Sequence, residues 1–272
     1  MFGAIAGDVI GSTYEWHNVK NIEFELFSRE SRFTDDTVMT IAVAEAILNK
    51  RKFKNPFKDN AHSKEAYAYA LKAYGKRHPN AGYGNMFNEW LSAKSIKPYN
   101  SFGNGSAMRV SPVGFAFNSI EEVLKEAKRS AMVTHNHKQG IRGAQSIAGA
   151  VYFARIGKDK SFIKNFIQHN FKYNLEFTLD EIREGYAFDS SCQGSVPQAI
   201  VAFLESEDYE DAIRKAISIG GDSDTIACMT GGIAQAYYRK IPKIIVDQVM
   251  LRLDSGFKEV IRQFNSKYDI QY

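Results

Sequence analysis

The sequence is short of cysteine, of long apolar runs and of basic residues at its start, and each shortage argues against a class of protein. Its 272 residues include two cysteines, Cys192 and Cys228, which form no C-x-x-C motif. A disulfide framework is therefore not expected, and a reducing compartment is favoured. No apolar run is long enough to span a bilayer. The first residues have no basic lead and are interrupted by Asp8, unlike a signal peptide. We expect a cytoplasmic protein that does not enter the membrane.

Strong charge of either sign is also missing. The formal net charge is +4 and is spread along the chain, so charge alone gives no reason to expect a nucleic-acid partner. Hydrophobic residues make up 44% of the sequence, which is enough for one substantial core or two small ones. Because no linker, low-complexity segment or clear repeat interrupts the chain, we predict a single domain over residues 1–272, and a monomer.

Alternating polar and apolar residues are nearly absent, so the sequence predicts few or no β-strands. Residues 21–27, "NIEFELF", are the one candidate, as a strand or a loop. Apolar residues instead recur at helical spacing. This pattern predicts helices over 37–50, 62–77 (ending at Gly75), 120–133 after the N-cap Ser119, 140–158, 195–207, 209–221 and 224–240. Small residues crowd 3–12, 143–152 and 228–238, which predicts a compact all-α protein with closely crossing central helices.

Residues 76–118 form the one long break in this helical pattern and are rich in Gly, Asn and Pro. We predict an irregular segment there. Long irregular segments inside a compact protein are usually functional.

Two short acidic segments stand where helices should begin: Thr34-Asp35-Asp36-Thr37 and Asp222-Ser223-Asp224-Thr225. Helix capping explains one acidic residue in each, because a cap needs one side-chain oxygen. Each segment instead offers two carboxylates and a hydroxyl, and neither contains His or Cys. Such hard oxygen ligands suit Mg²⁺, Mn²⁺ or Ca²⁺ better than Zn²⁺. Together they could hold a pair of ions about 3.5–4 Å apart. Capping and metal binding both remain open, and one residue can do both.

Several motifs resemble those of the ADP-ribosylglycohydrolase family, and they occur in the family's order. They are "GDVIGSTYEW" (7–16), "FTDDT" (33–37), "GNGSAMRVSPVG" (103–114), "THNH" (134–137), "SVPQAIVAFL" (195–204) and "GGDSDTIA" (220–227). The resemblance covers nearly the whole chain. It implies a compact orthogonal multi-helix bundle, all-α, around a binuclear metal site that holds two divalent ions, Mg²⁺ or Mn²⁺.

The resemblance also implies roles for the acidic residues. Thr34, Asp35 and Asp36 would bind one metal, and Asp222 and Thr225 the other, with Asp224 shared between them. Ser223 is not expected to be a ligand. Glu15 matches a glutamate that approaches the second metal and gates the site. Asp35 or Asp36 would act as the base or orient a water, and Glu15 is the alternative group for proton transfer.

Substrate contacts are implied in two glycine-rich loops. Residues 99–109, "YNSFGNGSAMR", resemble a loop that holds the diphosphate and the nearby ribose, and residues 80–87, "NAGYGNMF", resemble a second phosphate-contacting loop. The candidate residues are Gly82, Tyr83, Gly84, Tyr99, Asn100, Ser101, Phe102, Gly103, Asn104 and Gly105, together with His135. His137 and Arg109 are interpreted as structural, although Arg109 has a phosphate contact as its alternative. The loop before Ser195, "FDSSCQG", is left unassigned.

The function implied by the resemblance is metal-dependent hydrolysis of the bond between ADP-ribose and an acceptor, with release of ADP-ribose. The acceptor would be a protein side chain, Arg or Ser, and the sequence does not choose between them. Two alternatives stay open. One is a hydrolase of another ADP-ribose conjugate, either a free small molecule or a modified nucleic acid. The other is a non-catalytic ADP-ribose-binding or structural protein, since this fold is also found in a lens crystallin. The intact metal positions argue against the second alternative.

Overall fold

The architecture is built from helices, as the sequence predicts. The structure, a computed structural model, describes residues 1–49 and 64–272, and within those ranges there is no β-strand, only an isolated bridge between Gly103 and Ser191. The helices are α1 (Phe2–Gly11), α2 (Asp35–Leu48), α3 (Lys64–Arg77), α4 (Asn85–Ser92), α5 (Gly105–Met108), α6 (Ser111–Ala116), α7 (Ile120–Ala131), α8 (Lys138–Arg155), α9 (Lys160–Phe171), α10 (Leu179–Arg183), α11 (Cys192–Glu205), α12 (Tyr209–Ser218), α13 (Ser223–Tyr238), α14 (Lys243–Arg252) and α15 (Ser255–Tyr268).

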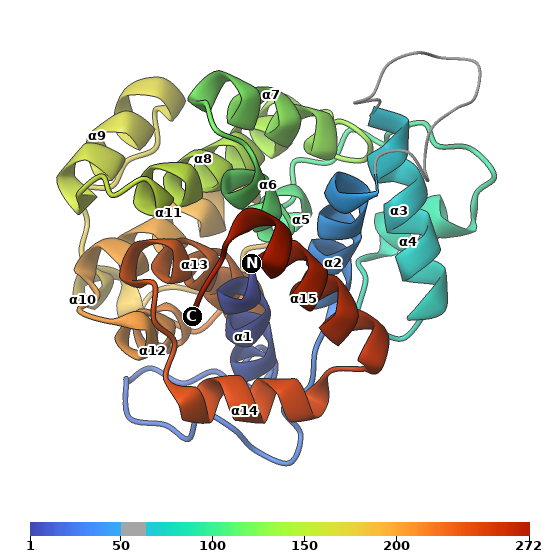
Figure 1. Cartoon of the computed structure of the whole chain (residues 1–272). Helices are drawn as coiled ribbons and strands as arrows, with labels where there is room; N and C mark the ends of the chain where they lie inside the picture. Colours follow the sequence, from blue (N-terminus) through green and yellow to red (C-terminus); the bar gives the residue numbers. More distant parts are fainter. Residues whose placement is uncertain (50–63) are drawn as a thin grey trace.

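The core is organised around the contact between α1 and α13 (Figure 1). Every residue of α1 is buried. A Cβ atom added at Gly7 would lie 2.1 Å from the carbonyl oxygen of Ala227, and one added at Gly11 would lie 2.5 Å from Cα of Asp224. The two backbones therefore touch without side chains between them, as the crowding of small residues predicts. This close approach brings Asp8 of α1 next to the first turn of α13.

The remaining helices surround this pair. Helix α2 packs against α1, α3, α6 and α15, while α8 packs against α7, α11 and α13. Helix α7 begins where its N-cap was predicted, because Ser119 accepts a hydrogen bond from the amide of Glu122 at 3.2 Å. None of the helices in the described part of the chain is both long and apolar enough to cross a membrane.

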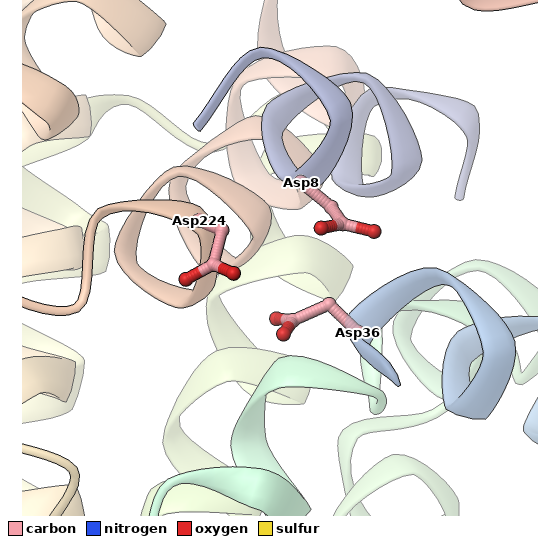
Figure 2. Close-up of side chains that lie close together, drawn as sticks. All are labelled: Asp8, Asp36 and Asp224. Carbon is pink, nitrogen blue, oxygen red and sulfur yellow. The ribbon is translucent and has the colours of Figure 1, made fainter. Parts of the chain in front are cut away.

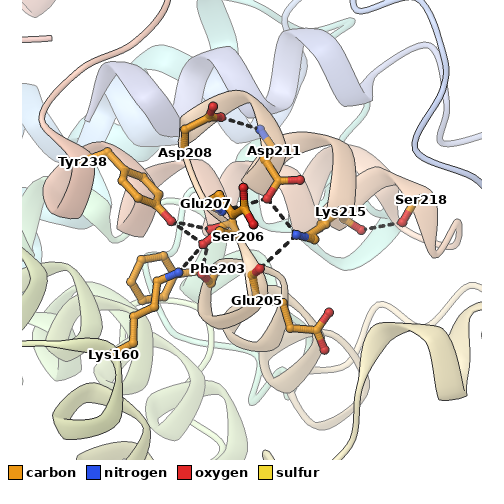
Figure 3. Close-up of polar contacts among 10 residues, drawn as sticks. All are labelled: Lys160, Phe203, Glu205, Ser206, Glu207, Asp208, Asp211, Lys215, Ser218 and Tyr238. Carbon is orange, nitrogen blue, oxygen red and sulfur yellow. Dashed lines mark hydrogen bonds and ion pairs between the residues drawn. The ribbon is translucent and has the colours of Figure 1, made fainter.

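The junction between α11 and α12 is held by lysines that reach backbone carbonyls (Figure 3). The ammonium of Lys160, from α9, donates to the carbonyl of Ser206 and lies 5.3 Å from the ring centre of Phe203. Lys215 donates to the carbonyl of Glu205 at 2.9 Å. Asp208 caps α12 by accepting from the amide of Asp211 at 2.9 Å. These bonds orient α12, which leads directly into Gly220, Gly221 and the second acidic segment.

Two local predictions were wrong. Helix α3 does not end at Gly75 but continues to Arg77; Gly75 faces Leu91 of α4, and a Cβ there would lie 2.6 Å from a Leu91 methyl carbon. The segment 76–118 is not irregular throughout, since it contains α4, α5 and α6, which are too short to show a helical period. Residues 21–27, predicted as a strand or a loop, form a loop. The remaining predicted helices are present with shifted ends. Lys50, His62 and Ser63, which were predicted to be helical, lie outside the described residues.

Candidate active site

The two acidic segments meet at the end of α1. Figure 2 shows the carboxylates of Asp8 (α1), Asp36 (α2) and Asp224 (α13) pointing toward one another, and each of these residues is buried. One oxygen from each lies within 4.8 Å of the others. A second group, formed by Glu15, Asp222 and Asp224, meets the same limit and shares Asp224 with the first. The structure thus has two adjoining clusters of carboxylates around one common residue.

Asp8 explains why α2 begins where it does. Its carboxylate accepts hydrogen bonds from the amides of Thr34 and Thr37, at 2.9 and 3.0 Å, and from both of their hydroxyls, at 2.6 and 2.5 Å. Thr34 in turn accepts from the amide of Asp36 at 3.3 Å. In the first turn of α2, the amides of Asp36 and Thr37 are therefore satisfied by Thr34 and Asp8. The Asp36 carboxylate is not needed for these bonds.

Asp36 has an oxygen without a partner. Its Oδ2 accepts a hydrogen bond from the hydroxyl of Thr225 at 3.2 Å, whereas Oδ1 is buried and has no hydrogen-bond partner among the described residues. A buried carboxylate oxygen without a partner is costly unless a cation satisfies it. The donors around it are carboxylates and hydroxyls, which are the ligands that Mg²⁺ and Mn²⁺ prefer. The residues present therefore fit a divalent metal site.

The electrostatics of the clusters agree with a need for positive charge. Burial, followed by the charges of Asp8 and Asp222, raises the pKa of Asp35 to about 8. Burial and then the charges of Asp222 and Asp8 raise the pKa of Glu15 to about 7. The pKa values of Asp36 and Asp224 are raised well above the usual range, again by burial first and by neighbouring carboxylates second. Without a cation these groups hold protons that free carboxylates would release.

A pocket of about 560 Å³ opens above the clusters. One side, here called the acidic wall, is formed by Glu15, Thr34, Asp35, Asp36, Asp222, Asp224 and Thr225, which are the residues predicted from the sequence as metal ligands. Ser223 is not part of it, since its hydroxyl bonds the carbonyl of Gly221 at 3.3 Å. Asp8 lies beneath this wall. Asp8 was not predicted as a site residue, although a lone carboxylate within a run of small and apolar residues was a usable signal.

Another part of the lining, here called the loop wall, contains most of the predicted substrate residues: Gly82, Gly84, Tyr99, Ser101, Phe102, Gly103, Asn104, Gly105 and His135. Two predicted residues do not line the pocket. Tyr83 is buried against Phe87, with ring centres 5.2 Å apart. Asn100 has a left-handed backbone with φ of 57°, and its amide donates to Asn136 at 2.8 Å. The residues next to Tyr83 and Asn100 in the sequence line the pocket, whereas Tyr83 and Asn100 themselves support the loops.

The loop wall presents a bare backbone and few charges. Gly82 has φ of 103°, which glycine adopts without strain, and it lies close to Asp35. A Cβ added at Gly103 would lie 3.2 Å from Oγ of Ser101, and one at Gly105 would lie 3.1 Å from Nε2 of His135. Gly103 and Gly105 therefore border Ser101 and His135, whereas Gly82 borders the carboxylate of Asp35.

His135 is held neutral with one ring nitrogen toward this wall. Burial and the charge of Arg109 lower its pKa well below the ordinary value. Arg109 donates to the Thr134 hydroxyl at 2.9 Å, and that hydroxyl lies 2.7 Å from Nδ1 of His135. Because Arg109 can only donate, the Thr134 hydrogen is available to Nδ1, which favours a hydrogen on Nε2 beside Gly105. Arg109 is buried and donates to the carbonyl of Ser130, as a structural residue would, but it also lines the pocket, as its alternative role of a phosphate contact requires.

His137 is structural, as interpreted from the sequence. Its side chain caps α8 by accepting from the amide of Gln139 at 3.2 Å. Several further residues that line the pocket were not assigned from the sequence, among them Trp16, Arg32, Phe188 and Ser190. Two of them belong to the unassigned loop before Ser195, whose irregular composition carries no motif. Trp16 follows Glu15 directly and is part of the motif at residues 7–16, but no role was predicted for it.

Comparisons with known proteins agree over the length of the chain. A family model described as ADP-ribosylglycohydrolase matches residues 1–269. The chain is similar to ADP-ribosylhydrolase ARH3 of Homo sapiens, with 29% identity over 313 residues, covering 88% of this chain and 84% of the relative. It is also similar to a putative ADP-ribosyl glycohydrolase of Acanthamoeba polyphaga mimivirus, with 23% identity over 295 residues, covering 92% and 89%. Among solved structures, a chain of an ADP-ribosylglycohydrolase-related protein complex shares the fold, with a TM-score of 0.65 and 21% identity, covering 99% of this chain and 97% of that one.

Proposed function

Because the chain belongs to the ADP-ribosylglycohydrolase family, we propose that it hydrolyses the glycosidic bond between ADP-ribose and an acceptor and releases ADP-ribose. The substrate class we propose is an ADP-ribosylated protein. The observation that carries this proposal is that one pocket is lined both by the clustered carboxylates and by the two glycine-rich loops.

The two walls assign the parts of the substrate by charge. A diphosphate is repelled by the carboxylates of the acidic wall and is favoured by the hydroxyl of Ser101 and by the Nε2–H of His135 on the loop wall. The distal ribose, which follows the diphosphate, then extends toward the acidic wall. Its anomeric carbon is the centre that reacts, and it lies where the carboxylates are gathered.

Two divalent ions, Mg²⁺ or Mn²⁺, would be held by Thr34, Asp35, Asp36, Asp222, Asp224, Thr225 and Glu15. When bound, such ions supply Lewis-acid polarisation of the sugar hydroxyls and of water. Asp8 acts differently, because its oxygens are occupied by α2. It positions the first acidic segment and adds negative charge beneath it.

The reaction adds the oxygen of water to the anomeric carbon and breaks the bond from that carbon to the acceptor. The transition state resembles an oxocarbenium ion, which nearby carboxylates stabilise. Asp35 or Asp36 takes the proton of the attacking water. Glu15 is only partly buried and borders the open pocket, so it is the carboxyl group placed to pass a proton to the departing acceptor.

The direct test uses defined substrates that carry ADP-ribose on arginine, on serine and on a nucleobase. Each is incubated with the protein and Mg²⁺ or Mn²⁺, and in parallel with EDTA, and ADP-ribose release is followed by mass spectrometry. We expect release from at least one substrate, and loss of that release in EDTA. Tight ADP-ribose binding without release from any of the substrates would identify a non-catalytic binding protein instead.

A further inference from the structure

Two exposed aromatic rings face each other at the mouth of the pocket. Trp16 is 72% exposed and Phe188 is 51% exposed. Their ring centres lie 6.1 Å apart with an angle of 16° between the planes, and both residues line the pocket. Core packing does not explain rings that remain this accessible to solvent. Exposed apolar surface beside a polar site is typical of ligand contact.

The loops that carry these rings are tied together. Lys20, in the loop of Trp16, donates to the carbonyls of Arg183 and Tyr186, both at 2.7 Å, and to that of Ile219 at 2.6 Å. Tyr186 is two residues before Phe188. One ammonium group therefore satisfies three carbonyls and fixes the first loop against the second. The separation of the two rings is set by the fold.

A second bond ties the loop of Trp16 to the acidic wall. Asn18 accepts a hydrogen bond from the amide of Gly221 at 2.6 Å, next to Asp222. Trp16 also follows Glu15, whose carboxylate belongs to the cluster with Asp222 and Asp224. Hydrogen bonding from the Trp16 side chain is one of the influences that lower the pKa of Glu15, against the larger effect of burial. Trp16 thus stands beside the acidic wall, while Phe188 is two residues before Ser190, whose carbonyl accepts from the amide of Asn104.

This position borders the path of the acceptor. If ADP-ribose lies as proposed above, its diphosphate is on the loop wall and its distal ribose is over the carboxylates. The acceptor then leaves the anomeric carbon toward the open mouth beside Glu15 and Trp16. An aromatic face next to a carboxylate offers both contacts that a guanidinium group makes, stacking and charge-assisted hydrogen bonds. A serine hydroxyl has neither a flat face nor a positive charge.

One protein cation opposes this preference. Arg32 also lines the pocket. Its charge lowers the pKa of Glu15, but other groups have larger effects on that pKa. Arg32 is exposed, so solvent and salt screen its repulsion of a cationic acceptor. The stacking surface of Trp16 is unaffected by that charge.

We propose that Trp16, backed by Phe188, is a specificity-determining residue that favours arginine-linked over serine-linked ADP-ribose. This inference rests on the proposed function and adds the acceptor class to it. Trp16 contacts the acceptor and is not required for the cleavage step itself.

The kinetic test compares Trp16→Ala with Trp16→Phe on two peptides of matched sequence, one modified on arginine and one on serine. Loss of a cation–aromatic contact should lower kcat/KM for the arginine-linked peptide about tenfold more than for the serine-linked peptide, because loss of the hydrogen bond to Glu15 acts on both substrates alike. Trp16→Phe should retain most of the activity, because it keeps an aromatic face. Ile22→Ala is a matched control, since Ile22 is 45% exposed in the same loop but does not line the pocket. Equal effects of Trp16→Ala on both peptides, or no effect, would overturn the inference.

A binding measurement keeps the test independent of catalysis. The chain has two tryptophans, and the other one, Trp90, is 5% exposed. With ADP-ribose bound, N-acetyl-arginine amide should change the tryptophan fluorescence, and N-acetyl-serine amide should not. The change should vanish in Trp16→Phe. An unchanged emission with the arginine compound rejects the role of Trp16, whereas absence of ADP-ribose release from every substrate rejects the proposed function.

Discussion

Nδ2 of Asn104 lies 2.6 Å from Oδ2 of Asp222, so the loop wall and the acidic wall of the pocket are joined by a direct hydrogen bond. The same amide group donates to the hydroxyl of Ser195 at 3.2 Å. The backbone amide of Asn104 donates to the carbonyl of Ser190 at 2.8 Å, and this bond fixes the turn that precedes α5. Asn104 therefore holds one carboxylate of the acidic wall in place while it shapes the loop opposite.

We predict that Asn104→Ala weakens both functions of the pocket together. The change leaves Oδ2 of Asp222 without its amide donor and releases the loop that ends at Gly105. ADP-ribose affinity should fall about tenfold, which corresponds to about 1.4 kcal/mol, and stabilisation by Mg²⁺ should also decrease. Calorimetry with ADP-ribose and thermal melts with Mg²⁺ measure the two effects. Loss of only one of them would show that the walls act independently.

Gly103→Val should weaken ADP-ribose binding at the loop wall without affecting metal binding at the acidic wall. A Cβ at this position already lies 3.2 Å from Oγ of Ser101 and 3.4 Å from the carbonyl oxygen of Ser190, and the valine methyl groups would block approach to the backbone. ADP-ribose affinity should fall at least about tenfold, while Mg²⁺ stabilises the variant as it does the parent. Gly185→Val is the control, because nothing lies within 4 Å of a Cβ added there. Unchanged ADP-ribose affinity in a folded Gly103→Val protein would contradict the assignment of the loop.

Divalent metal should stabilise the fold, because an ion that binds only the native clusters shifts the unfolding equilibrium. At a concentration about 100 times the dissociation constant, the gain is about 2.7 kcal/mol, or a rise in Tm of about 5–10 °C for a chain of this size. Asp224→Ala should lose most of that rise, since Asp224 belongs to both clusters. The experiment compares melts in EDTA, Mg²⁺ and Mn²⁺. Identical melting curves in all three would rule out the metal site.

The metal-free protein should lose stability as the pH rises. The folded-state pKa values of Asp35 and Glu15 are raised to about 8 and about 7, above unfolded values of about 4. Their stabilising contribution is complete below the unfolded pKa and is lost as the pH passes the folded pKa. The lowered pKa of His135 has the opposite effect, because it reduces stability as the pH falls below about 6.5. Urea unfolding in EDTA is therefore best measured from about pH 6.5 to 8.5. Mg²⁺ should reverse the slope, because deprotonated carboxylates bind it more tightly. Stability in EDTA that increases over this range would contradict the prediction.

Asp36→Asn decides between capping and catalysis in the first acidic segment. Asn caps a helix as well as Asp does, and here Thr34 and Asp8 already satisfy the first amides of α2. Stability should change little, whereas hydrolysis should fall at least about 10²-fold, as expected when a general base is lost. Asp208→Asn provides a matched control, because Asp208 is a simple cap of α12 and its change should leave activity intact. Parental activity in a folded Asp36→Asn protein would return the segment to a capping role.

The helical class and the gathering of the two acidic segments could be predicted from the sequence, because both depend on local patterns. Periodicity identifies α2, α7 and α13, and paired carboxylates at two helix starts indicate that these starts meet. Asp8 could not be placed in the same way. Its contact with Thr34 and Thr37 depends on how α1 crosses α2, which is a tertiary relationship without a local pattern.

Short elements and alternating loop residues account for part of the remaining differences; helices α9, α14 and α15 were also not predicted. Helices α4, α5 and α6 contain too few turns to show a period. Tyr83 and Asn100 lie in the predicted loops but do not line the pocket, because adjacent residues of a loop face in different directions and a motif marks the loop as a whole. Gly75 was read as a helix end, whereas it makes room for Leu91, a neighbour from another helix.

The backbone contact between α1 and α13 divides the pocket into parts with different freedom to evolve. Gly11 touches Asp224 so closely that any side chain there would displace a residue common to both carboxylate clusters. Substitutions in the acidic wall are therefore constrained by the packing of the core. Trp16 and Phe188 stand on loops with their rings in solvent, and substitutions there leave the core untouched. Relatives of this protein could therefore recognise a different acceptor through substitutions at these two positions, while the acidic wall stays unchanged.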